Sequence, residues 1–337
     1  MIPARDAYPE LILPLTGTTE LGTPSQECVI SVTENPPGWR IVAETVGRGD
    51  VRLDLRRARL ELSCNGQVAT VVLAAPKANI LDREMMRDLG WSLDGLIAKQ
   101  NLKVIVLTGE GPSFSYGASV REHLPDEIES TLHKLRELLI VVAKAPAPTI
   151  AAVRGHCLGG GFELALACDL IAAEETAQFG CPEIKLGVFP PAASALLPVR
   201  AGAGWASKIV LTGDTYTGKD LFAAGVVSRL ATGGELDMEL ERWLRSDFLP
   251  RSAAALRYAA AAARLPVLRA LEQELPLLEG IYFDKLMREP DAVEGIRAFL
   301  EKREPQWPAA GSATHEIPRQ QNEAAGGAPA PTGAKSI

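Results

Sequence analysis

Three consecutive glycines, Gly159 to Gly161, connect a buried strand to an apolar helix, and this junction constrains the fold more than any other feature of the sequence. Thr149 to Val153 is a short run of β-branched and small apolar residues, which predicts the strand. Phe162 to Cys168 has the composition of a helix. Because glycine has no side chain, the three glycines leave the backbone N–H groups at the helix N-terminus exposed. Unpaired donors and the helix dipole favour negative charge there. One interpretation is therefore an α/β protein in which this turn stabilises negative charge on a ligand.

The glycine run has a second interpretation, in which it only lets a helix and a strand pack closely. Glu163, in the first turn of the predicted helix, would then be an ordinary capping acid. Neither a Walker motif nor a Gly-x-Gly-x-x-Gly motif is present, which argues against a nucleotide-binding loop. Taken alone, the segment leaves both a ligand site and simple packing open.

Two further segments favour a site. Gly109 to Val120 follows a predicted buried strand at Lys103 to Thr108 and places Gly117 where the backbone is exposed. Thr176 to Pro191 carries a second carboxylate, Glu183, among apolar residues. An acid in such surroundings is hard to explain as a solvated surface residue.

Periodicity predicts the remaining elements. Asn65-Gly66 lies between alternating runs and favours a type I′ hairpin. Asp82 is expected to cap a helix that reaches about Gln100. A strand is expected at Val226 to Leu230, and helices are expected at 126–144, 203–211, 217–224, 235–246, 252–264, 270–288 and 291–302.

The order of the three segments resembles the crotonase (enoyl-CoA hydratase/isomerase) superfamily. The motifs are Phe114-Ser-Tyr-Gly-Ala118, Gly159-Gly-Gly-Phe-Glu163 and Pro182-Glu-Ile-Lys-Leu-Gly187, and the likeness covers residues 58 to 300. It implies a crotonase fold, in which repeated ββα units form a spiral core and a C-terminal helical region makes a trimer. The chain would divide into an N-terminal extension of undecided order (1–55), a catalytic core (56–232), the helical region (233–303) and a tail (304–337) whose composition predicts disorder.

The resemblance also assigns an active site. Glu163 would orient and activate water while Glu183 exchanges a proton with carbon, which requires two carboxyl groups in opposite protonation states. The backbone N–H groups of Ala118 and Gly160 would form an oxyanion hole that lowers the barrier by several kcal/mol. The acyl-CoA would run along a further set of residues: Lys77, Ala78, Ser115, Tyr116, Gly117, Val120, Gly159, Pro182, Phe189 and Pro190.

Some of these residues have simpler explanations. Lys77 is a candidate contact for phosphate or ribose, but an exposed lysine can equally be only solvated. Tyr116 is a candidate pocket wall. His123 and His156 border the motifs and are expected to be structural rather than catalytic.

Two details resemble one branch of the superfamily, the cyclohexa-1,5-diene-1-carbonyl-CoA hydratases of anaerobic aromatic (benzoyl-CoA) degradation. They lie in Phe114 to Pro125 and in Leu186 to Pro198. General enoyl-CoA hydratases more often carry Asp where Ser119 stands and a glycine-rich loop where Pro191 to Ser194 stands. The second departure implies a pocket reshaped beyond the β-carbon to suit a ring, and the product would be 6-hydroxycyclohex-1-ene-1-carbonyl-CoA.

Two alternatives stay open. A general enoyl-CoA hydratase or isomerase of fatty-acid-type β-oxidation would act on another acyl group, although isomerases of the superfamily commonly lack one of the two acids. A non-catalytic CoA-binding or RNA-associated homologue fits less well, because Glu163 and Glu183 lie in apolar sequence.

Composition limits the partners. The net charge of −7 argues against nucleic acid or an anionic membrane as a general partner. Five cysteines without metal-ligand spacing predict reduced thiols and no metal site. Because no apolar run reaches the length of a membrane span, we expect a cytoplasmic protein. The resemblance adds a homotrimer or hexamer and no separate cofactor, since coenzyme A is part of the substrate.

Overall fold

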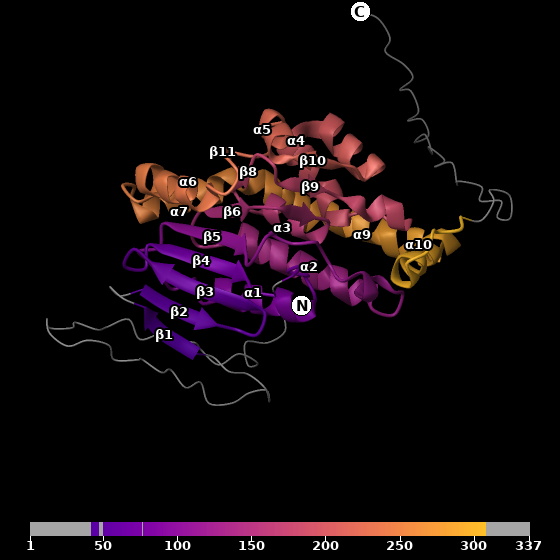
Figure 1. The fold of residues 1–337 in the computed structure, drawn as a ribbon, viewed down its shortest axis with the longest axis horizontal. Coiled ribbons are helices and arrows are strands. Elements are labelled where there is room, and N and C mark those ends of the chain that lie inside the picture. The colour runs from indigo at the N-terminus through magenta and orange to yellow at the C-terminus, as the bar shows by residue number, and fades with distance from the viewer. Residues whose placement is uncertain (1–41, 47–49, 76, 308–337) are drawn as a thin grey trace, which may run out of the picture.

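The computed structural model describes residues 42–46, 50–75 and 77–307, and within them a mixed eight-stranded sheet runs through the molecule (Figure 1). Its strands, in spatial order, are β1 (Val42–Val46), β2 (Asp50–Asp54), β3 (Ala58–Ser63), β4 (Val68–Leu73), β5 (Val104–Gly109), β6 (Thr149–Val153), β8 (Leu170–Glu174) and β11 (Arg229–Ala231). Neighbours from β1 to β4 pair antiparallel, and those from β4 to β11 pair parallel. The α/β class that the sequence predicts is confirmed.

A second, three-stranded sheet lies next to the site. It has the order β10 (Thr215–Thr217), β9 (Gln178–Gly180), β7 (His156–Leu158). β7 runs directly into the glycine run, and β9 is followed by the segment that carries Glu183. The small sheet therefore brings the two motifs side by side, because β7 and β9 pair parallel with Leu158 opposite Gly180.

The helices cover both faces of the main sheet. They are α1 (Arg83–Asp94), α2 (Ile128–Ala143), α3 (Gly160–Ala167), α4 (Pro191–Thr212), α5 (Gly218–Ala223), α6 (Leu236–Trp243), α7 (Ala253–Ala263), α8 (Leu265–Arg269), α9 (Leu275–Asp284) and α10 (Pro290–Glu301). The largest core cluster joins one sheet face to α1, α2, α3 and α4, and a smaller cluster joins the other face to α6. Burial of apolar area in these layers is the main favourable term in folding.

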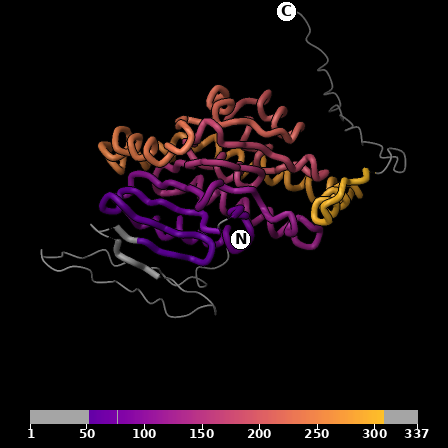
Figure 2. Tube along the Cα trace, viewed as in Figure 1, coloured from indigo at the N-terminus to yellow at the C-terminus, as the bar shows by residue number. Residues whose placement is uncertain are grey.

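The C-terminal helices return to the middle of the chain. Figure 2 shows α9 and α10, in orange and yellow, alongside magenta segments of the central part. α9 packs against α4 and α2, and α10 packs against the short 3₁₀ helix η3 (Pro182–Leu186). Residues far apart in sequence can therefore line one site.

Local turn chemistry agrees with the sequence at two places. Asn65 and Gly66 have φ of 58° and 75°, so the tight turn between β3 and β4 has the positive φ values of a type I′ turn, as predicted. Asp82 accepts a hydrogen bond from the N–H of Met85 at 2.8 Å and caps α1. Both predictions are confirmed.

Three elements differ clearly from their predicted bounds, and most others differ by a few residues at their ends. α1 ends at Asp94 instead of Gln100, because Gly95 is its C-cap and the chain then continues in turns. α4 begins at Pro191, well before 203, and contains a kink at Gly202, where φ is 79°. The strand expected at Val226 to Leu230 forms only at β11, because the N–H groups of the two valines donate to Leu221 O and close the end of α5.

The predicted N-terminal extension, 1–55, contributes two strands within the described residues. β2 pairs with β3 along four residue pairs, and β1 pairs with β2. Each strand has only five residues, a length at which period-two alternation is a weak signal. The rest of the extension and residues 308–337 of the predicted disordered tail lie outside the described residues. In the described chain no helix is long and apolar enough to cross a membrane.

Candidate active site

Two backbone N–H groups meet at the N-terminus of α3. A Cβ atom placed on Gly160 would lie 3.2 Å from the Ala118 nitrogen, so the two residues are in direct backbone contact. Within the described residues, neither the Ala118 N–H nor the Gly160 N–H donates a hydrogen bond to the protein. Two free donors beside the positive end of a helix can stabilise an oxyanion.

The loop that carries Ala118 is held by Ser115. Its buried hydroxyl donates to Asn79 O at 2.7 Å and accepts from the Gly117 N–H at 3.1 Å. The Gly117 carbonyl in turn accepts from the N–H of Leu81 at 2.9 Å. These bonds give the Ala118 amide a defined position before any ligand arrives.

Glu163 is buried one turn into α3. Its side chain is 3% exposed, and its Oε1 accepts a hydrogen bond from the N–H of Ala193 at 2.8 Å. Burial raises the pKa of Glu163 to about 7, although hydrogen bonds from the Ala193 and Ala192 amides favour the charged form. Those amides belong to the first turn of α4, so the N-terminus of a second helix also points at this carboxyl group.

Glu183 lies on η3 with its carboxyl group turned inward. Its Oε2 is buried and has no hydrogen-bond partner among the described residues. Burial, and secondarily the nearby charge of Glu163, raise the pKa of Glu183 to about 8. Two acids whose charges repel each other in a dry site hold one proton between them near neutral pH.

A small cavity joins these groups. Its volume is about 10 Å³, close to the smallest space that holds a water molecule. The residues that line it are Met86, Ala118, His123, Thr131, Leu132, Leu135, Gly160, Glu163, Glu183, Phe189, Pro190, Pro191 and Tyr282. Apart from the acids and a few hydroxyl and ring groups the lining is apolar, so a charge that develops inside would be weakly screened.

The structure brings some of the sequence-predicted residues to this cavity and leaves others outside its lining. Phe189 and Pro190 line it together with the two acids and the two oxyanion residues. Gly117, Gly159 and Pro182 are chain neighbours of lining residues, whereas Ser115 and Val120 lie further along the chain from Ala118. Neither the three other predicted residues, Lys77, Ala78 and Tyr116, nor His156 is part of the described lining.

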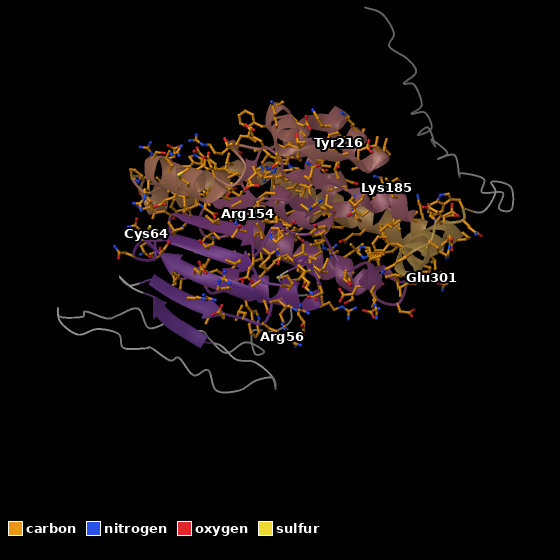
Figure 3. All side chains as sticks on the ribbon, viewed as in Figure 1. Arg56, Cys64, Arg154, Lys185, Tyr216 and Glu301 are labelled. Atoms are coloured by element: carbon orange, nitrogen blue, oxygen red, sulfur yellow. The ribbon has the colours of Figure 1, made fainter. Side chains whose placement is uncertain are left out.

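Those outer residues form a surface stretch. Tyr116 is 42% exposed, and its ring stacks on that of His156 with centroids 4.6 Å apart. The N–H of Tyr116 donates to Ala78 O at 2.9 Å, which ties the stretch to the loop before α1. Lys77 is exposed. Lys185, two residues after Glu183, is also exposed and is labelled in Figure 3.

Three polar residues of the lining were not predicted as pocket residues. His123 donates from Nδ1 to Ser119 O at 2.8 Å, and burial lowers its pKa, so the ring is neutral with a lone pair on Nε2. Thr131 lies on α2 and Tyr282 on α9, and each is 1% exposed. Only Thr131 has a sequence signal, a polar residue on the apolar face of a helix, and Tyr282 is indistinguishable from a core aromatic residue.

The part of the chain that the structure describes contains neither a side-chain group suited to hold a metal ion nor a disulfide bond. No group of three or more His, Cys, Asp or Glu side chains there could hold a metal ion. Cys157, Cys168 and Cys181 are buried free thiols and Cys64 is an exposed one. Burial raises the pKa of the three buried thiols, which makes them poor nucleophiles.

Comparisons with known proteins show the family to which the chain belongs. A family model described as enoyl-CoA hydratase/isomerase matches residues 63–310. The chain is 40% identical over 246 residues to cyclohexa-1,5-dienecarbonyl-CoA hydratase of Thauera aromatica, covering 73% of this chain and 95% of that protein. It is 35% identical to 2,3-dehydroadipyl-CoA hydratase of Escherichia coli, covering 74% and 98%.

Solved structures give the same result at the level of the fold. An enoyl-CoA hydratase from Mycobacterium avium subsp. paratuberculosis superposes with a TM-score of 0.66 at 25% identity, covering 74% of this chain and 98% of that one. An enoyl-CoA hydratase from Geobacillus kaustophilus superposes with a TM-score of 0.57 at 33% identity, covering 74% and 97%.

Proposed function

The chain belongs to the enoyl-CoA hydratase/isomerase family, has its crotonase fold and is a hydro-lyase, and from this premise we propose that it hydrates cyclohexa-1,5-diene-1-carbonyl-CoA. One observation carries the mechanism: Glu163 and Glu183 face one small cavity, next to two free backbone N–H groups. The likeness to the Thauera aromatica hydratase over nearly its whole length supports the choice of acyl group.

The backbone donors act on the thioester. Attack of water on the β-carbon pushes an electron pair toward the thioester oxygen, and the N–H groups of Ala118 and Gly160 stabilise the charge that develops there. Removing one donor of such a pair typically costs about 10²–10³ in rate. The donors are held in place before reaction by Ser115 and by the start of α3, so little reorganisation is needed.

The two acids divide the proton transfers. Glu163 accepts a hydrogen bond from the N–H of Ala193, which favours its charged form, so it is the ionised partner and takes a proton from water. Glu183 keeps its proton near neutral pH and gives it to carbon. Each turnover leaves the proton on the opposite acid, and exchange with solvent restores the starting state.

A conjugated ring changes where the proton ends. The hydroxyl group bonds to the β-carbon, and the electron pair moves through the thioester enolate into the second double bond. The proton then joins the far carbon of that bond, which gives 6-hydroxycyclohex-1-ene-1-carbonyl-CoA. The apolar side chains of Met86, Leu132 and Phe189 in the lining suit a hydrocarbon ring, and the cavity must widen as the ring enters.

The linear alternative rests on other relatives. The Escherichia coli relative is a 2,3-dehydroadipyl-CoA hydratase, and its name denotes a linear acyl group. The same acid pair and oxyanion donors would serve either substrate. The two candidate functions would differ only in the acyl group that the apolar walls of the pocket accept.

The test compares the two acyl groups directly. Cyclohexa-1,5-diene-1-carbonyl-CoA and crotonyl-CoA are supplied side by side to the wild type and to Glu183→Gln, with loss of conjugated absorbance and product mass as readouts. We expect selective hydration of the diene, lost in the variant. A higher kcat/KM for crotonyl-CoA would refute the ring substrate and leave the hydratase mechanism standing.

The proposal extends to aromatic degradation as the setting and to a cytoplasmic homotrimer or hexamer. Large apolar side chains at the surface support subunit contacts, since Leu211 and Leu277 are each 70% exposed. Analytical ultracentrifugation measures the assembly, and a monomeric mass at micromolar concentration would refute it.

A further inference from the structure

Two buried hydroxyl groups in the active-site cavity have no hydrogen-bond partner among the residues that the structure describes. Tyr282 and Thr131 both line the cavity, and each is 1% exposed. Within the described chain neither Tyr282 Oη nor Thr131 Oγ1 makes a hydrogen bond. A buried polar group without a partner is destabilising, so hydroxyl groups held this way are normally satisfied by something that enters the cavity.

The two hydroxyl groups belong to a rigid arrangement. Glu279, one turn before Tyr282 on α9, is buried and forms an ion pair with Arg136 on α2, the helix that carries Thr131. The ring of Tyr282 also packs on that of Phe189, with centroids 5.4 Å apart. Because the ion pair and the ring contact hold both helices beside the cavity, the two hydroxyl groups have little freedom to find hydrogen-bond partners elsewhere.

Tyr282 lies within electrostatic reach of both acids. Burial raises the pKa of its phenol, and the charges of Glu183 and Glu163 raise it further. The phenol therefore stays protonated at any pH at which the acids work, and it can donate a hydrogen bond. Thr131 can donate or accept.

A reacting water molecule needs these contacts. One lone pair of its oxygen points at the β-carbon, and one proton points at Glu163. One lone pair and one proton are left over, which match a donor and an acceptor. The cavity of about 10 Å³ has room for such a molecule.

We propose that the hydroxyl groups of Tyr282 and Thr131 bind the reacting oxygen, as water in hydration and as the substrate hydroxyl in dehydration. Tyr282 donates to the remaining lone pair, and Thr131 accepts the remaining proton. The inference rests on the proposed active site, but it does not depend on whether the acyl group is a ring or a linear chain.

The variants Tyr282→Phe and Thr131→Val remove each hydroxyl group and keep the shape. Tyr216→Phe is the matched control, because Tyr216 is a buried tyrosine on β10, outside the cavity lining (Figure 3). Each protein is assayed in both directions, with crotonyl-CoA and 3-hydroxybutyryl-CoA and with the cyclic diene and its hydroxylated product. Thermal unfolding shows that each variant is folded.

We expect Tyr282→Phe and Thr131→Val each to lower kcat for hydration about tenfold. Each should also raise KM for the hydroxyacyl-CoA about tenfold. The Kd of the unsaturated acyl-CoA, measured in a Glu183→Gln background, should stay unchanged, because that ligand lacks the reacting oxygen. A merely structural role would weaken both ligands alike. Equal weakening of both, or wild-type kinetics in both directions for both variants, would overturn the inference. Preference for the linear pair would count against the ring substrate alone.

Discussion

Glu183 lies against the backbone of Gly159, so close that a Cβ atom on Gly159 would come within 3.0 Å of Glu183 Oε1. Gly159 has φ of 48° and ψ of −126°, a backbone conformation that residues other than glycine rarely adopt. The first glycine of the run therefore does more than permit close packing. It leaves the space in which the second acid reaches the N-terminus of α3.

Replacing that glycine should damage catalysis more than folding. Gly159→Ala strains the backbone by about 1–3 kcal/mol and pushes the Glu183 carboxyl group away. A displacement of that kind costs about 10²-fold in rate. We expect kcat/KM to fall by about that factor while the protein remains folded in thermal unfolding.

Gly90→Ala is the matched control for this substitution. Gly90 lies inside α1, and a Cβ atom there would meet nothing within 4 Å. The change should raise helix stability by about 0.5–1 kcal/mol without an effect on kcat/KM. Full activity in Gly159→Ala would show that the contact with Glu183 is unimportant.

The rate should depend on pH in a bell-shaped manner. Below a pKa of about 7 Glu163 takes up a proton and can no longer accept one from water, and above a pKa of about 8 Glu183 loses the proton it gives to carbon. The maximum of kcat/KM is expected between these values. Glu183→Gln should flatten the alkaline limb of the residual activity, and an unchanged limb would assign it to another group.

The buried acids should also make stability depend on pH. Both folded-state pKa values lie above the ordinary 4.5, so the folded protein holds more protons than the unfolded chain between 4.5 and about 8. The stability that these acids contribute is greatest below about pH 4.5 and falls as the pH rises to about 8, by on the order of several kcal/mol for the pair. Chemical denaturation across this range measures the slope.

Glu183→Gln provides the comparison for that slope. The variant has no carboxyl group to ionise at this position, so its stability should exceed that of the wild type at pH 9 and match it more closely at pH 5. Parallel curves for the two proteins would mean that the Glu183 carboxyl group ionises with the same pKa in the folded and unfolded states.

The substitution Lys77→Gly should weaken acyl-CoA binding but raise the stability of the fold. Its φ of 112° is strained for a residue with a side chain. Lys77→Gly relieves this strain, which should stabilise the protein by about 1 kcal/mol, while loss of the ammonium group raises KM for acyl-CoA several-fold at constant kcat. Isothermal titration with coenzyme A and thermal unfolding test the two effects.

Lys302→Gly separates the two consequences. Lys302 is also exposed, has φ of 56° and ends α10. The same strain relief should stabilise this variant without a change in KM. If Lys77→Gly also leaves KM unchanged, the lysine is only solvated and does not contact the substrate.

Local signals in the sequence determined several turns and helix ends of this protein and indicated its family. The β3–β4 hairpin and the cap of α1 depend on a few adjacent residues, because backbone conformation at a turn or a helix end is decided by its own side chains. The order of the motifs around Gly117, Glu163 and Glu183 also indicated the family and the acids, since chemistry of this kind constrains residue types at particular positions.

Only the tertiary structure decided how the cavity is closed. Tyr282 and Thr131 come from helices far apart in the sequence, and their spacing within each helix is that of ordinary core residues. The strands before residue 55 likewise form where β3 offers an edge to pair with. Such features depend on which surfaces meet after folding. Thr131 stands out locally only as a polar residue on an apolar helix face, and no local pattern shows that it meets Tyr282 at one cavity.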